Sequence, residues 1–471
     1  MLAFLSDLLW SKVLIAFLIG LGIWFTVASR FVQFRYFGNM FSILSSKSRQ
    51  HDEQHLSSFQ ALVLSVAGRV GGGNIAGVAV AITLGGPGAI FWMWIVGLMG
   101  MATSFFECTL AQTYKSSEAD GTYRGGPAYY IERGLGKHWK WLSVLYSVLL
   151  FATFGIAFTT LQSYSVATSL EDAFGIPLYY SGIALALVVG LIIFGGVKRI
   201  AQVAEILVPI MAGGYLLIAL IVIGLNYADI PAMLSLIVKS AFGLEPAIGG
   251  GIGAAIMMGV KRGLFSNEAG LGSAPNVAAV AYVPHPANQG IVQSFSVFID
   301  TILLCTCTAL IILLGSAYDP SIAQDSVQGV ALTQASLATH MGEWGRIFVS
   351  IALLLFGFST ILYNYYLGEN SVSYVTHSGN NDFIMNAFRV VIICLCCTGA
   401  MLDLGTVFAF ADLTMGLLAL VNLIALAMLF KPAKRVMLDY ENQRKAGITT
   451  PTFAAEDFSD LELDETAWPK R

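Results

Sequence analysis

Residues 68–77 read GRVGGGNIAG, and they interrupt an apolar stretch that otherwise extends over residues 57–84. A second interruption, LFSNEAGLGSAP at residues 264–275, falls within the apolar stretch 252–282. Glycine, polar and charged residues therefore stand where a plain membrane helix has leucine. Interrupting a helix in lipid exposes backbone amides and carbonyls, each of which costs several kcal/mol unless it finds a partner. Both stretches are therefore candidate places for a ligand or an ion.

The rest of the chain has the composition of a membrane protein. Of its 471 residues, 56% are hydrophobic and only 11% are charged, whereas soluble domains carry about 25% charged residues. The apolar stretches are continuous, which suits spanning helices of about 20 residues rather than the alternating strands of a barrel. We predict an all-α polytopic membrane protein with about 11 transmembrane helices, near residues 13–28, 57–84, 89–113, 141–165, 178–194, 200–225, 252–282, 290–315, 344–367, 387–402 and 406–430.

The two interrupted segments are the second and the seventh, so each opens a block of five predicted spans. Because five is odd, the blocks have opposite orientations, and matched interruptions in such inverted repeats indicate the midplane site of a secondary transporter. The alternative is that the glycines only allow close helix packing. We predict an N-terminal helix and loop (1–56), two five-helix repeats (57–225 and 226–430) and a polar tail (431–471) that ends in an acidic run and is mobile.

Lysine and arginine residues indicate the orientation of the chain. Most of them fall in the loops 30–56 and 114–140 and in the tail, on one predicted side, whereas Lys12, Lys239 and Arg346 lie on the other. Cytoplasmic loops carry the excess of such residues. We therefore expect the N-terminus outside and the C-terminus in the cytoplasm, and we expect no nucleic-acid partner for the basic loops.

Several charged residues fall inside the predicted spans, where each is expected to face a cavity or a partner. Asp300 could bind a cation, carry a proton or pair with a base such as Arg69. Glu268 could satisfy amides of its own interrupted helix or act in function. Glu107 lies near the end of its span and is expected to be interfacial.

The ends of the first interruption suit ions of both signs. A half-helix that begins near Asn74 would present free N–H groups and a positive dipole end to a carboxylate. The carbonyls that end the preceding half, near Ala67 and Val70, suit a desolvated Na⁺.

Beyond these patterns, stretches of the sequence resemble the alanine or glycine:cation symporter family. They are residues 68–77 (GRVGGGNIAG), 84–94 (LGGPGAIFWMW), 125–127 (GGP), 195–209 (GGVKRIAQVAEILVP), 261–275 (KRGLFSNEAGLGSAP), 298–301 (FIDT) and 358–369 (FSTILYNYYLGE). The resemblance covers nearly the whole chain except the tail. It implies a leucine-transporter-like fold, a 5+5 inverted repeat with one extra N-terminal helix, that works by alternating access. It also implies symport of a small neutral amino acid with Na⁺, or alternatively H⁺, in the bilayer of a bacterial or archaeal inner membrane.

The resemblance also assigns residues. The substrate carboxylate would meet backbone N–H groups of Gly72 and Gly73. Together with the half-helix at Asn74, the implied substrate site comprises Gly72, Gly73, Asn74, Gln162, Phe265, Ser266, Asn267, Thr360 and Asn364. The implied sodium site comprises the carbonyls of Ala67 and Val70 and the hydroxyls of Ser359 and Thr360, with Asp300 as a further candidate ligand from its place in the span.

Three departures from the family pattern affect the substrate. Gly72 stands where the family often has a larger residue, Tyr164 replaces a common asparagine, and Tyr363-Asn364 replaces Gly-Trp. Asn364 follows Thr360 by one helical turn and shares its face. Losing an indole there enlarges the pocket and adds an amide, so our hypothesis is a substrate larger than alanine, such as glutamine. If Tyr363 or Tyr164 refills the space, alanine and glycine are the substrates.

Two other classes of protein compete with a carrier. An ion channel would need tandem pore loops or a ring-forming repeat, and the sequence has neither. An intramembrane enzyme would need a nucleophile with a base, or a set of metal ligands, and no histidine lies in any predicted span. We therefore expect no enzymatic activity. The sequence sets no oligomeric state.

Overall fold

The computed structural model describes residues 2–45, 56–118, 121–244, 251–318, 329–376, 382–402 and 404–468. This part of the chain is a bundle of helices with one two-stranded antiparallel sheet, in which β1 (Ser116–Ser117) pairs with β2 (Tyr123–Arg124). The helices of the first half are α1 (Leu2–Leu9), α2 (Ile15–Ala28), α3 (Val32–Arg35), α4 (Asn39–Ser45), α5 (Ser58–Arg69), α6 (Val78–Gly85), α7 (Gly88–Thr113), α8 (Pro127–Leu135), α9 (Lys140–Leu150), α10 (Thr159–Phe174), α11 (Leu178–Ile193) and α12 (Gly196–Leu225).

The second half continues with the same kind of element. Its helices are α13 (Ile230–Ala241), α14 (Gly251–Asn267), α15 (Ser273–Val280), α16 (Pro286–Val297), α17 (Thr306–Leu314), α18 (Val330–Met341), α19 (Glu343–Thr376), α20 (Asp382–Gly399), α21 (Leu404–Met428) and α22 (Phe430–Lys445). Wider, π-helical turns lie within several spans: η1 (Trp10–Leu14), η2 (Gly73–Gly77), η4 (Phe151–Phe158) and η5 (Phe298–Cys305). A helix or an interrupted pair of helices covers each predicted apolar segment, and the prediction of an all-α polytopic fold is confirmed.

Length and composition separate these helices into two groups. Six helices of the described chain are long and apolar enough to cross a bilayer, and the bent pair α5–α6 makes a seventh. The other predicted spans are covered by shorter apolar helices such as α11 and α20, or by the second interrupted pair, α14 and α15. Short helices of this kind cross a membrane when they are paired or continued by other elements, as α1, η1 and α2 continue one another.

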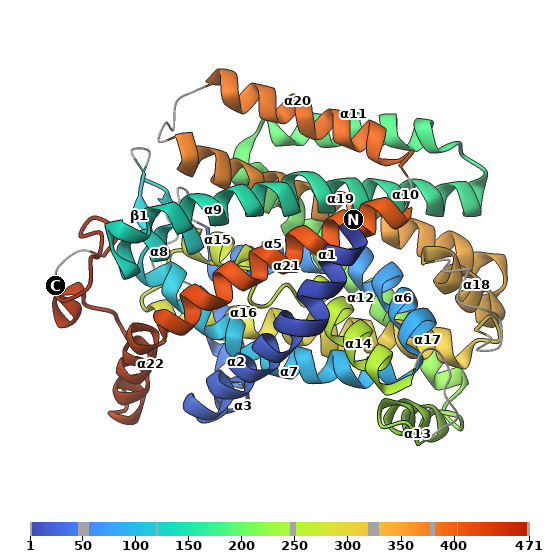
Figure 1. Cartoon of the computed structure of the whole chain (residues 1–471), viewed down its shortest axis with the longest axis horizontal. Coiled ribbons are helices and arrows are strands. Elements are labelled where there is room, and N and C mark those ends of the chain that lie inside the picture. Colours follow the sequence, from blue (N-terminus) through green and yellow to red (C-terminus); the bar gives the residue numbers. More distant parts are fainter. Residues whose placement is uncertain are drawn as a thin grey trace.

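Long helices run along the longest dimension of the molecule (Figure 1). Helix α7 packs against both α14 and α16, α10 packs along α19, and α11 pairs with α20 at one edge of the bundle. Helix α19 also contacts α5, and α7 also contacts α15, so the two interrupted helices lie between long, continuous ones. This arrangement places both interruptions inside the bundle.

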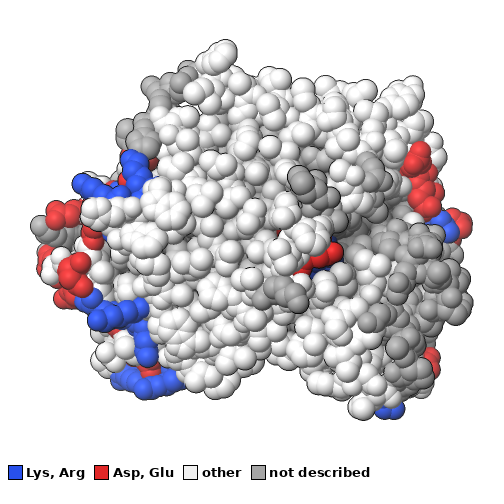
Figure 2. Space-filling view, viewed as in Figure 1, with Lys and Arg blue, Asp and Glu red and all other residues white. Residues whose placement is uncertain are grey.

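Charged side chains gather at the ends of the bundle and leave between them a wide band that is uncharged apart from one small patch near its middle (Figure 2). Most lysine and arginine side chains on the face shown lie at the end where α8, α22 and the C-terminus are found, which we call the basic end. An uncharged band with charged rims is the surface expected of a protein that spans a membrane.

The first interruption follows from its glycines. Helix α5 begins with a capping box, in which Ser57 Oγ accepts from the Gln60 amide at 3.1 Å and Gln60 Oε1 accepts from the Ser57 amide at 3.0 Å. It ends at Arg69, where Val70 takes an extended conformation with ψ of 92°. Residues 73–85 then continue at an angle of 50° to α5. Glycine lowers the cost of such a bend because it has no side chain to clash.

The second interruption relies on left-handed backbone conformations. Helix α14 ends at Asn267 and α15 begins at Ser273. Between them Glu268, Gly270 and Gly272 have φ angles of 56°, 92° and 81°. Glycine adopts these angles freely, but Glu268 is strained there and must be held by its surroundings.

The prediction of a mobile tail is wrong for residues 449–468, which pack against the basic end. The Phe453 amide donates to the Pro284 carbonyl at 2.8 Å, and Trp468 Nε1 donates to the Gln112 carbonyl at 3.1 Å. Phe453, Phe458 and Trp468 are buried. The acidic run suggested a solvated segment, but the interleaved aromatic side chains bury enough apolar surface to hold it down.

Candidate functional site

Oxygen atoms converge where α5 ends beside α19. The Ala67 carbonyl accepts hydrogen bonds from Ser359 Oγ at 3.2 Å and from Thr360 Oγ1 at 3.0 Å. Both hydroxyls also reach the Phe356 carbonyl, at 2.9 Å each. Val70, three residues after Ala67, is fully buried at the end of α5. Carbonyl and hydroxyl oxygens at the end of a half-helix are the groups that coordinate Na⁺ in membrane carriers.

Phe356 was not predicted, because only its backbone takes part. Serine and threonine in helices commonly donate to the carbonyl three or four residues earlier. Ser359 and Thr360 both follow this rule, and so the position of Phe356 could have been inferred from theirs.

A second polar cluster surrounds Asp300 in η5. Asn74 Nδ2 donates to Asp300 Oδ1 at 2.7 Å, and Ser266 Oγ lies 2.9 Å from Oδ2. Thr301 Oγ1 donates to the same Oδ2 at 2.7 Å. This carboxylate therefore joins both interrupted helices, because Asn74 follows the first break and Ser266 precedes the second.

The possible pairing of Asp300 with Arg69 is not seen. Arg69 Nη1 donates to the Gln293 carbonyl at 3.2 Å, and its Nη2 donates to Ser104 Oγ at 3.2 Å. Nη1 also contacts Ser296 Oγ. In the described chain, then, neutral oxygens accept from both terminal nitrogens of this buried guanidinium, while its Nε has no partner. Neutral donors surround Asp300. A carboxylate of that kind is able to bind a cation.

The three consecutive glycines of the first interruption meet three other helices. The Gly72 amide donates to Gln162 Oε1, from α10, at 3.0 Å. A Cβ atom on Gly71 would lie 2.6 Å from Thr360 Oγ1, and one on Gly73 would lie 3.1 Å from the Ser266 Cα. Side chains here would collide with their neighbours, so glycine is required for this close approach.

Phe265 forms an aromatic wall beside the glycines. Its ring would be 3.4 Å from a Cβ on Gly73, and it packs edge-on against Phe158 at a centroid distance of 4.9 Å. Phe408 approaches from α21 at 6.2 Å. The wall therefore combines η4, α14 and α21 around the end of α14.

The two predicted asparagines differ in their surroundings. Asn267 Oδ1 accepts from the Ala269 amide at 3.0 Å and so caps its own interruption, while its Nδ2 has no partner in the described chain. Asn364 is fully buried, and neither its Oδ1 nor its Nδ2 has a partner among the described residues. An unsatisfied buried amide costs about 1–3 kcal/mol per group, which a bound ligand would recover.

The structure places Glu107 differently from its expected interfacial position, because this residue is fully buried. Glu107 Oε1 accepts from the Gly270 amide at 3.3 Å, the role that was considered for Glu268. Glu268 Oε2 instead accepts from Ser273 Oγ at 2.6 Å and from the Tyr363 hydroxyl at 3.3 Å. Glu107 lies near the end of α7, but packing over that end removes it from the interface.

An ion cluster joins α14 to α21 next to the aromatic wall. Arg262 Nη2 lies 2.6 Å from Asp412 Oδ2, and Lys261 Nζ lies 3.0 Å from the same oxygen. All three side chains are buried. Trp10 from the N-terminal span donates to the Asp412 carbonyl at 3.0 Å. Sequence analysis missed Asp412, although an acid inside the last apolar segment was a usable signal.

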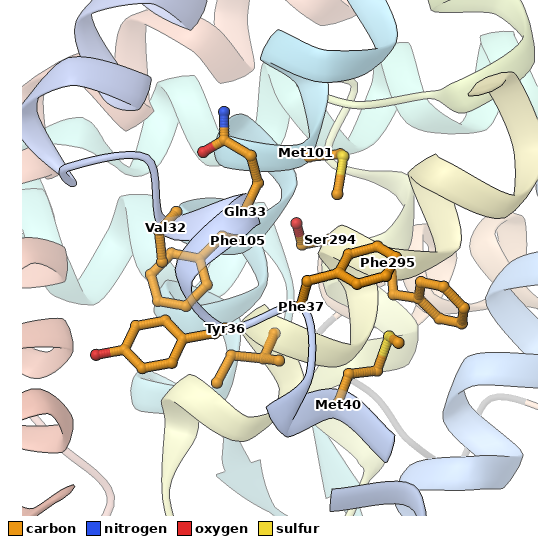
Figure 3. A pocket seen from close by; sticks show the side chains of 10 residues that line it. Val32, Gln33, Tyr36, Phe37, Met40, Met101, Phe105, Ser294 and Phe295 are labelled. Atoms are coloured by element: carbon orange, nitrogen blue, oxygen red, sulfur yellow. The ribbon is translucent and has the colours of Figure 1, made fainter. Parts of the chain in front are cut away.

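A small cavity lies elsewhere, between α3, α7 and α16 (Figure 3). Apolar side chains such as Met40, Met101 and Phe295 line most of it, with Gln33 and Ser294 as polar members. None of the predicted site residues lines it. The candidate site is therefore the pair of interruptions rather than this cavity.

Two interrupted helices that meet inside a bundle, with oxygen clusters at both breaks, define a secondary transporter. The chain belongs to the sodium:alanine symporter family, whose model matches residues 1–455. It is therefore a multi-pass amino-acid carrier coupled to sodium or protons, and not an enzyme. The predicted family and transport class are confirmed.

Individual relatives agree with this assignment. The chain is 47% identical over 442 residues to the probable sodium/glutamine symporter GlnT of Bacillus subtilis, covering 94% of this chain and 90% of the relative. It is 45% identical to the amino-acid carrier protein AlsT of Bacillus subtilis, covering 98% of this chain and 96% of the relative. It is 39% identical to a sodium/proton-dependent alanine carrier protein of Bacillus sp. PS3, covering 84% and 90%.

Solved structures of distant sequence share the fold. MhsT in complex with L-phenylalanine matches with a TM-score of 0.55 at 14% identity, covering 78% of this chain and 88% of that one. A manganese transporter of Eremococcus coleocola, in complex with an aromatic bis-isothiourea substituted compound, matches with a TM-score of 0.53 at 14% identity, covering 80% and 78%. The expected leucine-transporter-like fold is confirmed by these similarities.

Proposed function

We propose that this carrier imports a neutral amino acid together with Na⁺ bound at the end of α5. The observation that carries the proposal is the convergence of the Ala67 and Phe356 carbonyls with the hydroxyls of Ser359 and Thr360. With Val70 these groups supply five oxygens from two helices. Moving α5 against α19 would separate them, so a bound ion favours the closed arrangement of the two helices.

Asp300 is proposed as a ligand of a second cation, or of the same cation at another step. Its oxygens are surrounded by Asn74, Ser266 and Thr301, which offer further oxygen atoms. The support is that the carboxylate is buried and has no salt bridge in the described chain. A monovalent cation would neutralise it and tie both interruptions together.

The substrate is proposed to lie between the glycines and Phe265. Its carboxylate would take the place of Gln162 Oε1 at the Gly72 amide and would also meet the amide of Gly73. Gln162 would then be free to bind another group of the amino acid. Ser266 and Asn74 border the same space from the two interruptions. The side-chain oxygen of Asn267 already accepts from the Ala269 amide in the second interruption.

We propose glutamine as the preferred substrate, with alanine as the alternative. The unpartnered amide of Asn364, one turn from Thr360, supports this choice because it offers both donors and an acceptor to a side-chain amide. A relative of 47% identity is named as a probable sodium/glutamine symporter, whereas another relative is named as an alanine carrier. Alanine cannot pair with Asn364 through its methyl group.

The orientation proposed from the loops places the basic end in the cytoplasm and the N-terminus outside. The concentration of lysine and arginine at one end of the bundle supports it (Figure 2). The proposed organisation is an N-terminal helix and loop (1–56), two inverted five-helix repeats (57–225 and 226–430) and a C-terminal segment (431–471) in a bacterial cell membrane.

Transport by purified protein in liposomes tests the proposal. Labelled glutamine uptake should saturate, should require an inward Na⁺ gradient, and should be inhibited by unlabelled glutamine more than by alanine. Replacing Na⁺ with choline at constant pH separates sodium coupling from proton coupling. Uptake that is unaffected by this replacement would favour a proton-coupled carrier, and a non-saturating flux would favour a channel.

A further inference from the structure

Glu107 is a buried carboxylate that the proposed sodium and substrate sites do not use. It projects from α7, and each of its oxygens accepts a hydrogen bond from a neutral donor. Oε1 accepts from the Gly270 amide at 3.3 Å, and Oε2 accepts from Asn422 Nδ2 at 3.1 Å. Neutral donors on both oxygens suit the ionised form of the carboxylate.

No lysine or arginine nitrogen lies within salt-bridge distance of Glu107 in the described chain. The nearby base, Arg69, is bound to Ser104, Ser296 and the Gln293 carbonyl. The other described titratable groups that interact with Glu107 are Cys108 on α7, Tyr130 on α8 and Tyr146 on α9. None of these is a cation, and Arg69 acts on Glu107 only through its charge, without an ion pair in the described chain. Binding a proton therefore removes a buried charge that has no ion-pair partner there.

Asn422 connects this carboxylate to the second interruption. Besides donating to Glu107, its Nδ2 donates to the Gly270 carbonyl at 2.9 Å. Its Oδ1 accepts from the Tyr130 hydroxyl. One amide on α21 therefore holds Glu107, the interruption and α8 together, and every group in the network is buried.

A proton on Glu107 Oε2 changes this network in a defined way. The protonated oxygen is a donor, and the Asn422 amide must turn to present Oδ1 to it. The Tyr130 hydroxyl can then accept from Nδ2 instead of donating to Oδ1, so it stays satisfied. The Gly270 carbonyl loses its donor. Protonation thus breaks the direct hydrogen bond between α21 and the second interruption.

We propose that Glu107 is the proton-binding group of this carrier, and that its proton loosens the link between α21 and the second interruption. The proposal rests on the transport function proposed above. One O–H bond forms at Glu107 with a proton taken from water on one side of the membrane, and the same bond breaks when the proton leaves. Glu107 does not contact the proposed sodium ligands, so the proton and Na⁺ bind without competing for one site.

The test compares the pH dependence of sodium-driven uptake in liposomes that contain the full chain. Each protein is measured between about pH 5.5 and about pH 8.5, and each rate is divided by that protein's own maximum. The unmodified protein should change severalfold over this range, because the occupancy of a single site changes about tenfold per pH unit beyond its midpoint. Glu107→Gln should lose this response. Glu343→Gln, the same change at an exposed position, should retain it.

A second variant covers the case in which Glu107→Gln does not fold. Asn422→Asp keeps the shape of the side chain but places another carboxylate beside Glu107, so the pair should hold a proton more strongly. The midpoint of the pH response should move upward by about one unit or more. An unchanged pH response in Glu107→Gln, or an unchanged midpoint in Asn422→Asp, would overturn the assignment.

Two results for the unmodified protein separate the two proposals. Sodium-driven uptake without any pH response would overturn the role of Glu107 and leave the transport function intact. Absence of sodium-driven uptake at every pH would instead contradict the proposed function. A pH-sensitive dye trapped in the liposomes adds a direct readout, because proton movement should accompany uptake in the unmodified protein and in Glu343→Gln only.

Discussion

The hydroxyl of Thr360 donates a hydrogen bond to the carbonyl of Ala67 over 3.0 Å, although the two residues are 293 positions apart in the chain. The contact joins the last turn of α5 to the middle of α19. Both residues are buried, so the hydrogen bond is shielded from water. A sodium ion at this place would be held by two helices whose separation opens the site.

Removing the Thr360 hydroxyl should weaken sodium binding. Thr360→Ala takes one oxygen from a dry site, and hydrogen bonds or ligands to a charged group are worth about 1.5–3 kcal/mol, which corresponds to a loss of roughly 10- to 100-fold in apparent Na⁺ affinity. Thr360→Ser, which keeps the hydroxyl, is the matched control. The measurement is the Na⁺ concentration for half-maximal uptake, and equal values for the two variants would refute the assignment.

A side chain at Gly73 should abolish substrate binding. The Cβ atom alone would lie 3.1 Å from the Ser266 Cα, and the branches of valine would enter the space beside Phe265. Gly73→Val should therefore insert into the membrane but bind no substrate. Gly213→Val, on α12 where a Cβ meets nothing within 4 Å, is the control and should transport normally. Normal uptake by Gly73→Val would place the site elsewhere.

Asn364 should decide between larger and smaller amino acids. Asn364→Trp fills the pocket and removes the amide, so glutamine should lose affinity while alanine keeps it. Asn364→Leu, which is similar in length to asparagine but has no polar atoms, should lose glutamine preference without blocking the space. Competition between the two amino acids for labelled uptake measures the effect. If both variants keep the original preference, Asn364 does not contact the substrate side chain.

The ion cluster between α14 and α21 has two cations for one carboxylate. Removing the carboxylate should therefore destabilise the protein more than removing one of the cations. Asp412→Asn leaves Lys261 and Arg262 buried without an acid, which should destabilise the protein by about 3–5 kcal/mol. Lys261→Met leaves Arg262 paired with Asp412 and should cost far less. Thermal unfolding in detergent compares the two. A larger loss in Lys261→Met than in Asp412→Asn would contradict this account.

The C-terminal segment should bind the basic end more strongly as the pH rises. The Lys115 amine is enclosed by the rings of Tyr123 and Trp468, at 3.9 and 4.2 Å, and burial lowers its pKa to about 7. When the segment is released, the amine regains an ordinary pKa of about 10.4. The released state thus binds more protons between these values, and docking gains stability as pH increases from about 7 to about 10.

Hydrogen exchange of residues 449–468 measures this docking. Protection should increase over that pH range, after correction for intrinsic exchange, and Lys115→Met should remove the dependence because it keeps the apolar stem without the amine. Protection that decreases as the pH rises would show that the attraction of the cation to the two rings outweighs the cost of burying it.

The sequence by itself determined the class of fold, the positions of the apolar segments and the two interruptions. These features are local: span length follows from hydrophobic thickness, and the interruptions follow from glycine clusters such as Gly71–Gly73. Asn74 could be chosen because the second half of the interrupted helix begins near it, and the family resemblance assigned Gln162, Phe265, Ser266, Ser359 and Thr360.

Only the tertiary structure decided which of these groups meet. Ala67 and Thr360, or Asn74 and Asp300, belong to different helices, and their contact depends on how those helices pack along their whole length. Glu107 was expected at an interface because its position along α7 is near the end, but α21 and the second interruption enclose it. Burial is a property of the assembled bundle, since a side chain loses water only when other segments cover it.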